Sequence, residues 1–323
     1  MHASRENVAR AFGGGKVILL GEHGVVYGRP GLAAGIRRGV TATAEVCEHA
    51  LLQCEPWGVE VECSAERHGG ARGEATLAHA FAAVLRDYPE LPKVRVRVEI
   101  DLPGGAGLGC SAAIGVAVVG ALDRFHGVVR SAQEIAEASM AWERVFHGNP
   151  SGIDNAVSAM GGVVVFRRDA GVRPVPLARR LWLVVGNSEE PSSTKDMVAN
   201  VAARHAEDEV WSNRRFDAMA ELCGRGERAC VGGDLEALGQ AMLENQELLR
   251  DFDLVTPRLD AMCLAALGAR ALGAKVTGAG GGGCMVALAR DAAAAEGIRD
   301  AIAETSGSAF VAAVECSQRE AET

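Results

Sequence analysis

Several features that would place a chain in a special class are missing from this sequence. No stretch reaches the run of about 18 apolar residues that a membrane-spanning helix needs. The first residues, MHASRENVARAFGGGKV, carry charges but lack the apolar core of a secretory signal. There is no internal repeat and no low-complexity tract. We therefore expect a globular, cytoplasmic protein.

Paired cysteines and an excess of positive charge are missing as well. The nine cysteines are scattered without a CxxC pair, and the eight histidines do not cluster with them. This pattern argues against a zinc site and favours reduced, mostly buried thiols. The net charge of −9 argues against nucleic acid or an anionic membrane as partners. An anionic small substrate stays compatible, because a pocket can be locally positive in an acidic protein.

The composition and element pattern predict a two-domain α+β protein. The chain has 323 residues, 48% of them hydrophobic, and its 40 glycines gather in a few loops. The polar, proline-bearing segment 167–180 predicts the boundary, which we place so that the domains span residues 1–175 and 176–323. Periodicity and capping signals predict strands and helices along both parts. The expected strands are 16–20, 39–46, 58–66, 94–100, 161–166, 181–186, 284–289 and 308–316, and the expected helices 74–88, 111–125, 131–146, one starting at Thr256-Pro257, and 291–304.

The most informative segment is PGGAGLGCSAA, the first glycine loop, which lies between a predicted strand and a predicted helix. Glycines let a backbone approach an anion closely, and the free N–H groups of a first helical turn carry partial positive charge. Ser111 could offer its hydroxyl to a phosphate-bound Mg²⁺. The segment fits either a phosphate cradle or a tight turn into a core helix. It is neither a Walker A loop nor a dinucleotide fingerprint.

Three further segments carry candidate chemistry. In GGGKVILLGEHGVVYG, Lys16 is either a solvated lysine at a strand end or a cation that neutralises a transferring phosphoryl group. In WERVFHGNPSGIDNAVSAMGG, Glu143 and Asp154 flank a predicted turn. They are either solvated carboxylates or a pair of which one holds Mg²⁺ and one acts on a hydroxyl. In KVTGAGGGGCMVALA, the second glycine loop (Gly278–Gly283) lies between two predicted strands and could form a second backbone surface at a phosphate or substrate.

Together these parts indicate phosphoryl transfer, and the segments resemble the sequence motifs of the GHMP small-molecule kinases. The matching segments are GKVILLGEHGVVYG, PGGAGLGCSAA, HGNPSGIDNAVSAMGG and TGAGGGGC, so the resemblance covers nearly the whole chain. It implies an N-terminal domain like domain 2 of ribosomal protein S5 and a ferredoxin-like C-terminal domain. The order and spacing are most similar to the members that phosphorylate the 5-hydroxyl of mevalonate. ATP as co-substrate, Mg²⁺ as cofactor and mevalonate as substrate are therefore implied, and the family is compatible with a homodimer.

The resemblance also implies roles for individual residues. Lys16 and Asp154 would be catalytic, with Asp154 either a base or an orienting carboxylate. Ser111 and Glu143 would hold Mg²⁺. The ATP phosphates would contact Pro103, Gly104, Gly105, Ala106, Gly107, Leu108, Gly109, Cys110 and Ser111. Substrate-binding residues would be Glu22, His23, Thr194, Gly280 and Gly281.

The sequence departs from the family pattern at Cys110 and at Gly24, which replaces a common alanine, and two alternative functions stay compatible with it. Cys110 stands where the family usually has the first of two serines, a change that we expect the chemistry to tolerate because Ser111 is kept. The chain could instead be another GHMP kinase, such as a galactokinase-like sugar kinase, whose first motif also has Gly-Glu-His. It could also be a non-catalytic nucleotide-binding regulator. Such regulators usually lose the lysine or a carboxylate, and this chain keeps Lys16, Glu143 and Asp154.

Overall fold

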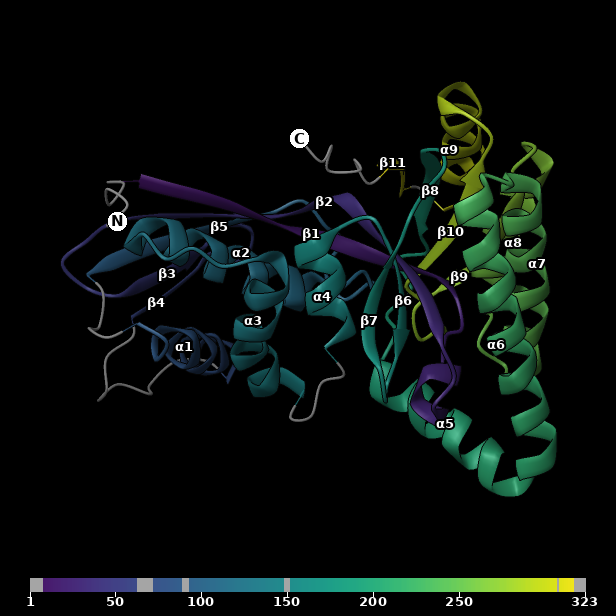
Figure 1. The fold of residues 1–323 in the computed structure, drawn as a ribbon, viewed down its shortest axis with the longest axis horizontal. Coiled ribbons are helices and arrows are strands. Elements are labelled where there is room, and N and C mark those ends of the chain that lie inside the picture. The colour runs from purple at the N-terminus through teal and green to yellow at the C-terminus, as the bar shows by residue number, and fades with distance from the viewer. Residues whose placement is uncertain (1–7, 63–71, 89–92, 148–151, 307, 317–323) are drawn as a thin grey trace, which may run out of the picture. The chain divides into compact units, whose positions relative to one another are not determined.

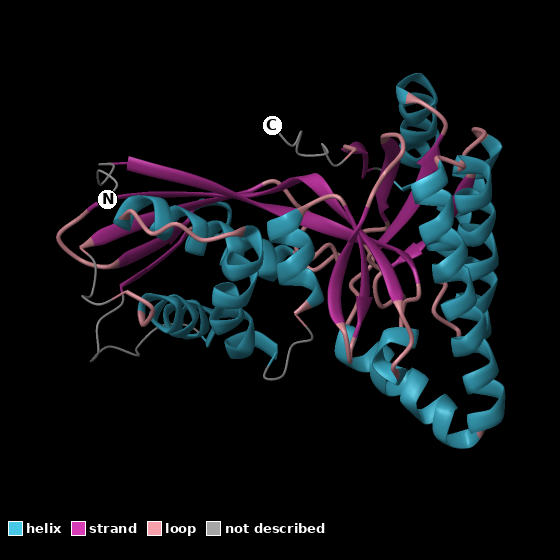
Figure 2. Ribbon diagram, in the orientation of Figure 1, coloured by secondary structure: helices cyan, strands magenta, loops and turns pink. Residues whose placement is uncertain are grey.

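The computed structural model describes residues 8–62, 72–88, 93–147, 152–306 and 308–316 (Figure 1). Its internal contacts group the chain into two compact units. Unit 1 contains the N-terminal residues as far as Gly15 together with Arg38–Leu102 and Gly109–Met160. Unit 2 contains Lys16–Arg37, Pro103–Leu108 and the chain from Gly161 onward. Both units mix helices and strands (Figure 2), which confirms the α+β class.

In its described residues, unit 1 is a sheet with four helices. Its elements are β1 (Val8–Leu20) as far as Gly15, β2 (Gly31–Val46) from Arg38, β3 (Leu51–Cys54), β4 (Val59–Glu62), β5 (Val94–Ile100), α1 (Arg72–Leu85), α2 (Cys110–His126), α3 (Ala132–His147) and α4 (Ile153–Met160), with a 3-10 turn at Glu55–Trp57. The strand order is β4-β3-β5-β2, and β1 pairs with β2. The alternation predicted for β5 is confirmed, because Val94, Val96 and Val98 are buried while Arg95 and Arg97 are half-buried. The expected helix 131–146 is confirmed as α3, and a capping box starts it: the Glu134 N–H donates to Ser131 Oγ at 3.3 Å, and the Ser131 N–H donates to Glu134 Oε2 at 2.7 Å.

Strand β1 begins eight residues before the predicted strand at Lys16, because its glycines serve packing instead of a loop. A Cβ added to Gly13 would lie 2.2 Å from the Ala113 carbonyl oxygen in α2. A Cβ added to Gly39 on β2 would lie 2.1 Å from the Gly13 carbonyl oxygen. Only glycine permits this approach of strand to strand and of helix α2 to the sheet. The helix that follows the first glycine loop is therefore seated directly on β1.

Unit 2 holds most of the C-terminal half. Its strands are the end of β1 from Lys16, the start of β2 as far as Arg37, β6 (Val163–Arg167), β7 (Gly171–Val175), β8 (Leu181–Asn187), β9 (Gly273–Thr277), β10 (Cys284–Ala289) and β11 (Ser308–Val314). Its helices are α5 (Thr194–Glu207), α6 (Glu209–Gly232), α7 (Leu235–Asp251), α8 (Pro257–Gly268) and α9 (Ala292–Ser306), with a 3-10 turn at Gly24–Tyr27. The predicted helix start at Thr256-Pro257 is confirmed, since Thr256 Oγ1 accepts from the Leu259 N–H at 3.2 Å.

The four-stranded sheet of unit 2 has the order β11-β8-β10-β9 with antiparallel neighbours. Counted within this sheet the order is 4-1-3-2, which is the ferredoxin-like arrangement that we expected. Helices α7, α8 and α9 pack against its strands. The apolar core around them includes Val184, Phe216, Met262, Val276 and Ile302. This core supports the strand β9, which leads into the second glycine loop.

The segment proposed as a boundary is more ordered than its composition indicates. Residues 171–175 form β7, which pairs antiparallel with β6. A proline at position 174 is compatible with this strand because β7 is at the edge of its sheet. The division of the chain into domains 1–175 and 176–323 stays a prediction.

Candidate active site

The first glycine loop has a backbone that requires glycine. Gly105, Gly107 and Gly109 have φ values of 67°, 76° and 74°, in the left-handed region that other residues adopt only with strain. A Cβ added to Gly104, Gly105 or Gly107 would meet no atom within 4 Å. Packing against neighbouring atoms therefore does not require glycine at these three positions. The three glycines are exposed, so the backbone of this loop is accessible, as a surface that receives an anion requires.

Helix α2 starts from this loop without a side-chain cap. Its N-cap residue is Gly109, and the first helical bond runs from the Ala113 N–H to the Gly109 carbonyl at 3.0 Å. The partial positive charge at this helix end stays available to an anion. Burial raises the pKa of the Cys110 thiol to about 11, so Cys110 is a neutral thiol at this position.

Ser111 and Glu143 bring two side-chain oxygen groups together in unit 1, a hydroxyl and a carboxylate. Ser111 Oγ donates a hydrogen bond to Glu143 Oε1. Glu143 is 4% exposed, and its Oε2 lies 3.6 Å from Nε2 of the exposed His147. Burial raises the pKa of the Glu143 carboxyl, the Ser111 hydrogen bond and His147 oppose that rise, and the charge of Asp154 adds to it. The carboxylate is thus incompletely neutralised by its protein neighbours.

Asp154 is in the first turn of α4, held against α3 by a buried polar contact. Asn155 Nδ2 donates to Ser139 Oγ at 2.7 Å, and Ser139 Oγ donates to the Ala136 carbonyl at 2.8 Å. This contact fixes the helix that carries Asp154 relative to the helix that carries Glu143. Of the predicted turn formers, Asn149-Pro150 and Ser151 lie outside the described residues, and Gly152 has a φ of 81°.

The donor set fits Mg²⁺ better than a transition metal. Within the described part of the chain, no group of three or more His, Cys, Asp or Glu side chains is arranged to hold a metal by itself. Mg²⁺ takes oxygen ligands, and proteins usually supply only one or two of them beside substrate phosphates and water. The Ser111 hydroxyl and the Glu143 carboxylate, which are within hydrogen-bond distance of each other, meet that requirement.

In unit 2, Lys16 lies on β1 beside the first glycine loop. Its backbone N–H donates to the Leu108 carbonyl at 2.9 Å. The residue is only 7% exposed, so it is not the solvated strand-end lysine that is one interpretation of the sequence. Two residues further along β1, the Ile18 N–H donates to Thr277 Oγ1 at 2.7 Å, and the Ile18 carbonyl accepts from the same hydroxyl at 3.1 Å.

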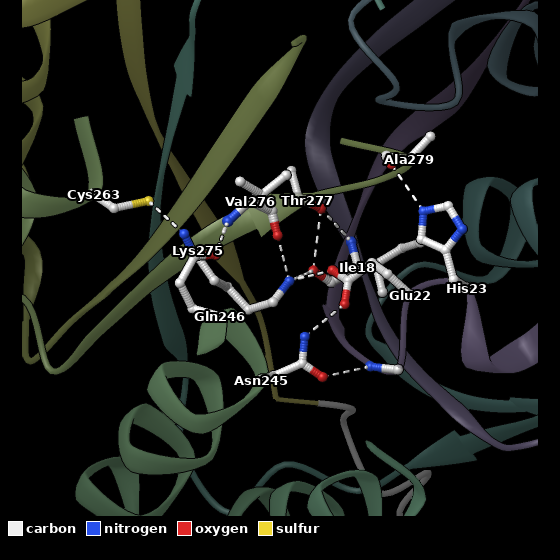
Figure 3. Close-up of polar contacts among 11 residues, drawn as sticks. Ile18, Glu22, His23, Asn245, Gln246, Cys263, Lys275, Val276, Thr277 and Ala279 are labelled. Carbon is white, nitrogen blue, oxygen red and sulfur yellow. Dashed lines mark hydrogen bonds and ion pairs between the residues drawn. The ribbon is translucent and has the colours of Figure 1, made fainter. Parts of the chain in front are cut away.

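The turn after β1 presents Glu22 and His23 (Figure 3). His23 has a φ of 54°, and its Nε2 lies 2.8 Å from the Ala279 carbonyl oxygen. Since a carbonyl only accepts, Nε2 carries the proton and Nδ1 is left as an acceptor. Burial lowers the pKa of His23, against smaller opposing effects of Ala279 and Glu22, so the neutral ring is favoured. Glu22 is 1% exposed and has both carboxylate oxygens paired with Lys275 and Asn245.

The second glycine loop packs against the first in unit 2. A Cβ added to Gly283 would lie 3.1 Å from the Ala106 carbonyl, and one added to Gly278 would lie 3.5 Å from the Gly107 carbonyl. Both glycine loops therefore lie side by side, as a shared backbone surface requires. The Gly281 N–H is used internally, because it donates to the Leu254 carbonyl at 2.8 Å.

Thr194 is placed near that second loop by its neighbours. It is the exposed first residue of α5, which Ser193 caps by accepting from the Asp196 N–H at 3.2 Å. Ser192, two residues earlier, donates from Oγ to the Gly280 carbonyl at 2.6 Å. The structure therefore brings Thr194 and the Gly280 segment into one neighbourhood of unit 2.

Sequence reasoning overlooked three buried polar residues, Lys275, Asn245 and Asn155. In unit 2, Lys275 and Asn245 hold Glu22 through hydrogen bonds. In unit 1, Asn155 holds α4 to Ser139 on α3. For Lys275 a signal was present, since a lysine in the otherwise apolar approach to a glycine loop needs a buried partner. Asn245 and Asn155 lie on helices whose apolar pattern gives no hint of their partners.

The family of the chain follows from comparison with known proteins. Residues 75–162 match the model of the GHMP kinases N terminal domain, and residues 219–307 match the model of the GHMP kinases C terminal domain. The chain belongs to the GHMP kinases, and it is an enzyme of that family.

Within this family, the chain is similar to mevalonate kinases. It is 34% identical to the mevalonate kinase of Methanothermobacter thermautotrophicus, over 84% of this chain and 87% of that protein. It is 31% identical to the mevalonate kinase of Aeropyrum pernix, over 95% of this chain and 96% of that protein. The crystal structure of L. major mevalonate kinase in complex with R-mevalonate has a TM-score of 0.84 and 26% identity, covering 98% of this chain and 99% of that one.

None of the described helices combines the length and the apolar character that crossing a bilayer requires.

Proposed function

We propose that this enzyme transfers the γ-phosphoryl group of ATP to the 5-hydroxyl of mevalonate, yielding mevalonate 5-phosphate and ADP. One observation carries the reaction type: the Ser111–Glu143 oxygen pair lies at the uncapped N-terminus of a helix, directly after a left-handed glycine loop. That is the combination of phosphate surface and metal ligands that phosphoryl transfer uses. The substrate is inferred from relatives with 31% and 34% identity that are mevalonate kinases.

In this proposal the first glycine loop, Pro103–Ser111, binds the ATP phosphates through its backbone N–H groups and the start of α2. Ser111 and Glu143 would hold Mg²⁺. When bound, the ion neutralises phosphate charge as the bond to the leaving ADP breaks. The partly uncompensated Glu143 carboxylate supports this assignment, because a cation supplies the charge that its protein neighbours lack.

Lys16 and Asp154 act on the reacting atoms. Lys16 stabilises the negative charge on the transferring phosphoryl group, which a positioned cation does best where water is excluded. Asp154 either takes the proton of the substrate hydroxyl as a general base or orients that hydroxyl. In either case the hydroxyl oxygen forms the new bond to phosphorus while the bond from phosphorus to the ADP oxygen breaks.

In unit 2, the substrate contacts His23, Thr194, Gly280 and Gly281. Glu22 belongs to the same site as the residue that holds the turn carrying His23. His23 contributes a fixed, neutral ring whose Nδ1 accepts from a hydroxyl of the substrate. We assign the enzyme to the cytoplasm, since the eight cysteines of the described residues are free thiols.

The test is production of ADP from Mg-ATP with mevalonate, phosphomevalonate, galactose or homoserine as acceptor, followed by ³¹P NMR of the product. We expect turnover with mevalonate and a phosphomonoester on its primary carbon. Turnover of galactose without turnover of mevalonate would instead establish the sugar-kinase alternative. An Asp154→Asn variant, purified in parallel, excludes a contaminating kinase. Its kcat should fall by a factor of about 100 or more with KM for ATP nearly unchanged.

A further inference from the structure

A buried ion pair lies directly behind the Glu22–His23 turn (Figure 3). Lys275 Nζ is paired with Glu22 Oε1, and both side chains are 0% exposed. Nζ also donates to the Val276 carbonyl and, at 3.4 Å, to the Ile18 carbonyl. An ammonium group has three donors, so these three acceptors saturate Lys275. Lys275 is therefore turned inward and has no donor left for a substrate.

The second oxygen of Glu22 is held from helix α7. Asn245 Nδ2 donates to Glu22 Oε2 at 3.0 Å, and Asn245 Oδ1 accepts from the Gly21 N–H at 3.2 Å. One amide side chain thus grips two consecutive residues of the turn. With Lys275 on one oxygen and Asn245 on the other, the charge of the Glu22 carboxylate is balanced by the lysine and both of its oxygens accept hydrogen bonds.

Strand β9 and the loop after it contact the end of β1 and the Glu22–His23 turn at three successive points. Thr277 Oγ1 binds both backbone groups of Ile18, Lys275 binds Glu22, and the Ala279 carbonyl accepts from His23. Lys16 lies two residues before Ile18 on the same strand. The strand β9 is itself tied to α7, because Gln246 Oε1 accepts from the Val276 N–H at 2.9 Å.

We propose that Lys275 and Asn245 are positioning residues, which fix Glu22 as an internal anchor and thereby set the positions of His23 and Lys16. This inference rests on the proposed function of those two residues. Glu22 then acts on the substrate through the turn that it holds, and not by touching it. A charged pair suits this task because its hydrogen bonds have defined directions, whereas an apolar pair of equal volume fills the space without orienting the turn.

The experiment is a double-mutant cycle on the pair, with steady-state kinetics and thermal unfolding of the full chain. The variants are Glu22→Met, Lys275→Met and Glu22→Met/Lys275→Met. Each single variant leaves one buried group without its partner, whereas the double variant is apolar and should recover most of the lost melting temperature. We expect kcat/KM for mevalonate to stay at least about 10-fold below wild type in the double variant, because misplaced catalytic groups are not restored by stability.

The cycle separates an anchor from a substrate ligand. If Glu22 works only through the Lys275 contact, the double variant should be no worse than about 3-fold below the single Lys275→Met variant. If the fold-loss in kcat/KM of the double variant equals the product of the fold-losses of the two single variants, the proposal is overturned. Glu22 would then contact the substrate independently of Lys275. A stable double variant with wild-type kcat/KM would also overturn it, because the pair would then serve stability alone.

Two further variants keep the test interpretable if the single charge variants fail to fold. Asn245→Ala removes the grip on Gly21 and Glu22 without leaving an unpaired buried charge, and we expect kcat/KM to fall about 10-fold. Wild-type kinetics in Asn245→Ala would count against the proposal. The control, Arg225→Met, removes a cation from the partly exposed Arg225–Glu244 pair of unit 2 and should leave kcat/KM unchanged. Failure of wild-type enzyme to phosphorylate mevalonate would instead reject the proposed substrate, and the cycle would be run on the acceptor that is turned over.

Discussion

Glu22 and Glu143 are both almost fully buried, at 1% and 4% exposed, yet their carboxylates have different partners. Glu22, in unit 2, has a lysine on one oxygen and an asparagine amide on the other. Glu143, in unit 1, has the Ser111 hydroxyl on one oxygen and the mostly exposed imidazole of His147 at 3.6 Å from the other. The same side chain is thus fully neutralised in one unit and only partly neutralised in the other.

This difference separates architecture from ligand binding. A buried carboxylate that is paired with a buried ammonium needs nothing further, so it contributes by holding its surroundings in place. A buried carboxylate whose pKa is raised by burial, as that of Glu143 is, gains from any cation that arrives. Burial alone would have grouped the two residues together, and the partners distinguish them.

The sharpest way to break this comparison is the same substitution at both positions. Glu22→Gln leaves the buried ammonium of Lys275 without a counter-charge, so the free energy of unfolding should fall by about 3–5 kcal/mol. Urea denaturation followed by circular dichroism measures this loss. Glu244→Gln, which changes an exposed ion pair in the same unit, should cost no more than about 1 kcal/mol. An equal loss in the two variants would contradict the assignment of Glu22 as an anchor.

Glu143→Gln should show the opposite pattern. The amide oxygen can still accept from Ser111, so we expect the free energy of unfolding to change by less than about 1 kcal/mol. The kcat at fixed Mg²⁺ should fall about 100-fold, because a ligand that places the metal charge is lost. Titration of activity against Mg²⁺ concentration checks the cause, and an unshifted Mg²⁺ dependence would show that Glu143 is not a ligand.

A smaller effect concerns pH and the turn that Glu22 anchors. Because burial lowers the pKa of His23 below its usual 6.5, the unfolded chain binds more protons than the folded one between the two values. His23 therefore costs no stability above pH 6.5, and the free energy of unfolding falls as the pH drops below 6.5 toward the lowered pKa. Urea midpoints measured from pH 5 to pH 8 should decline less at the acid end in His23→Gln than in wild type. Parallel curves would contradict this assignment.

The smallest expected effect, a near-unchanged kcat, concerns Cys110, which precedes the Ser111 that is bonded to Glu143. Cys110→Ser introduces the residue that the family resemblance implies at this position. It should leave kcat within about 3-fold of wild type, because a neutral thiol and a neutral hydroxyl are both uncharged and Ser111, not residue 110, is assigned to the metal. Ser111→Ala removes the metal-side hydroxyl and should lower kcat by at least about 10-fold. Steady-state kinetics of the two variants test whether Ser111 is the metal-side residue. A larger loss of kcat in Cys110→Ser than in Ser111→Ala would reverse that assignment.

Regular elements were predictable where a local signal exists. The alternation of Val94, Val96 and Val98 marks β5, and the capping residues Ser131 and Thr256 mark two helix starts. The beginning of β1 was missed because its glycine triplet has the composition of a loop. Gly13 is there to admit helix α2, a contact with residues 100 positions away that no local window contains.

By itself, the sequence determined the glycine loops, the motif residues Lys16, Ser111, Glu143 and Asp154, and the family that they resemble, because these depend on residue types at short spacings. The tertiary structure alone decided that the Glu22 carboxylate is paired with a buried ammonium group, whereas the Glu143 carboxylate is only partly compensated. The partners of Glu22 are 253 and 223 residues away in sequence, and the Ser111 that binds Glu143 is 32 residues away. The task of a buried carboxylate depends on which partners folding brings within hydrogen-bond distance, and that is a property of the packed chain.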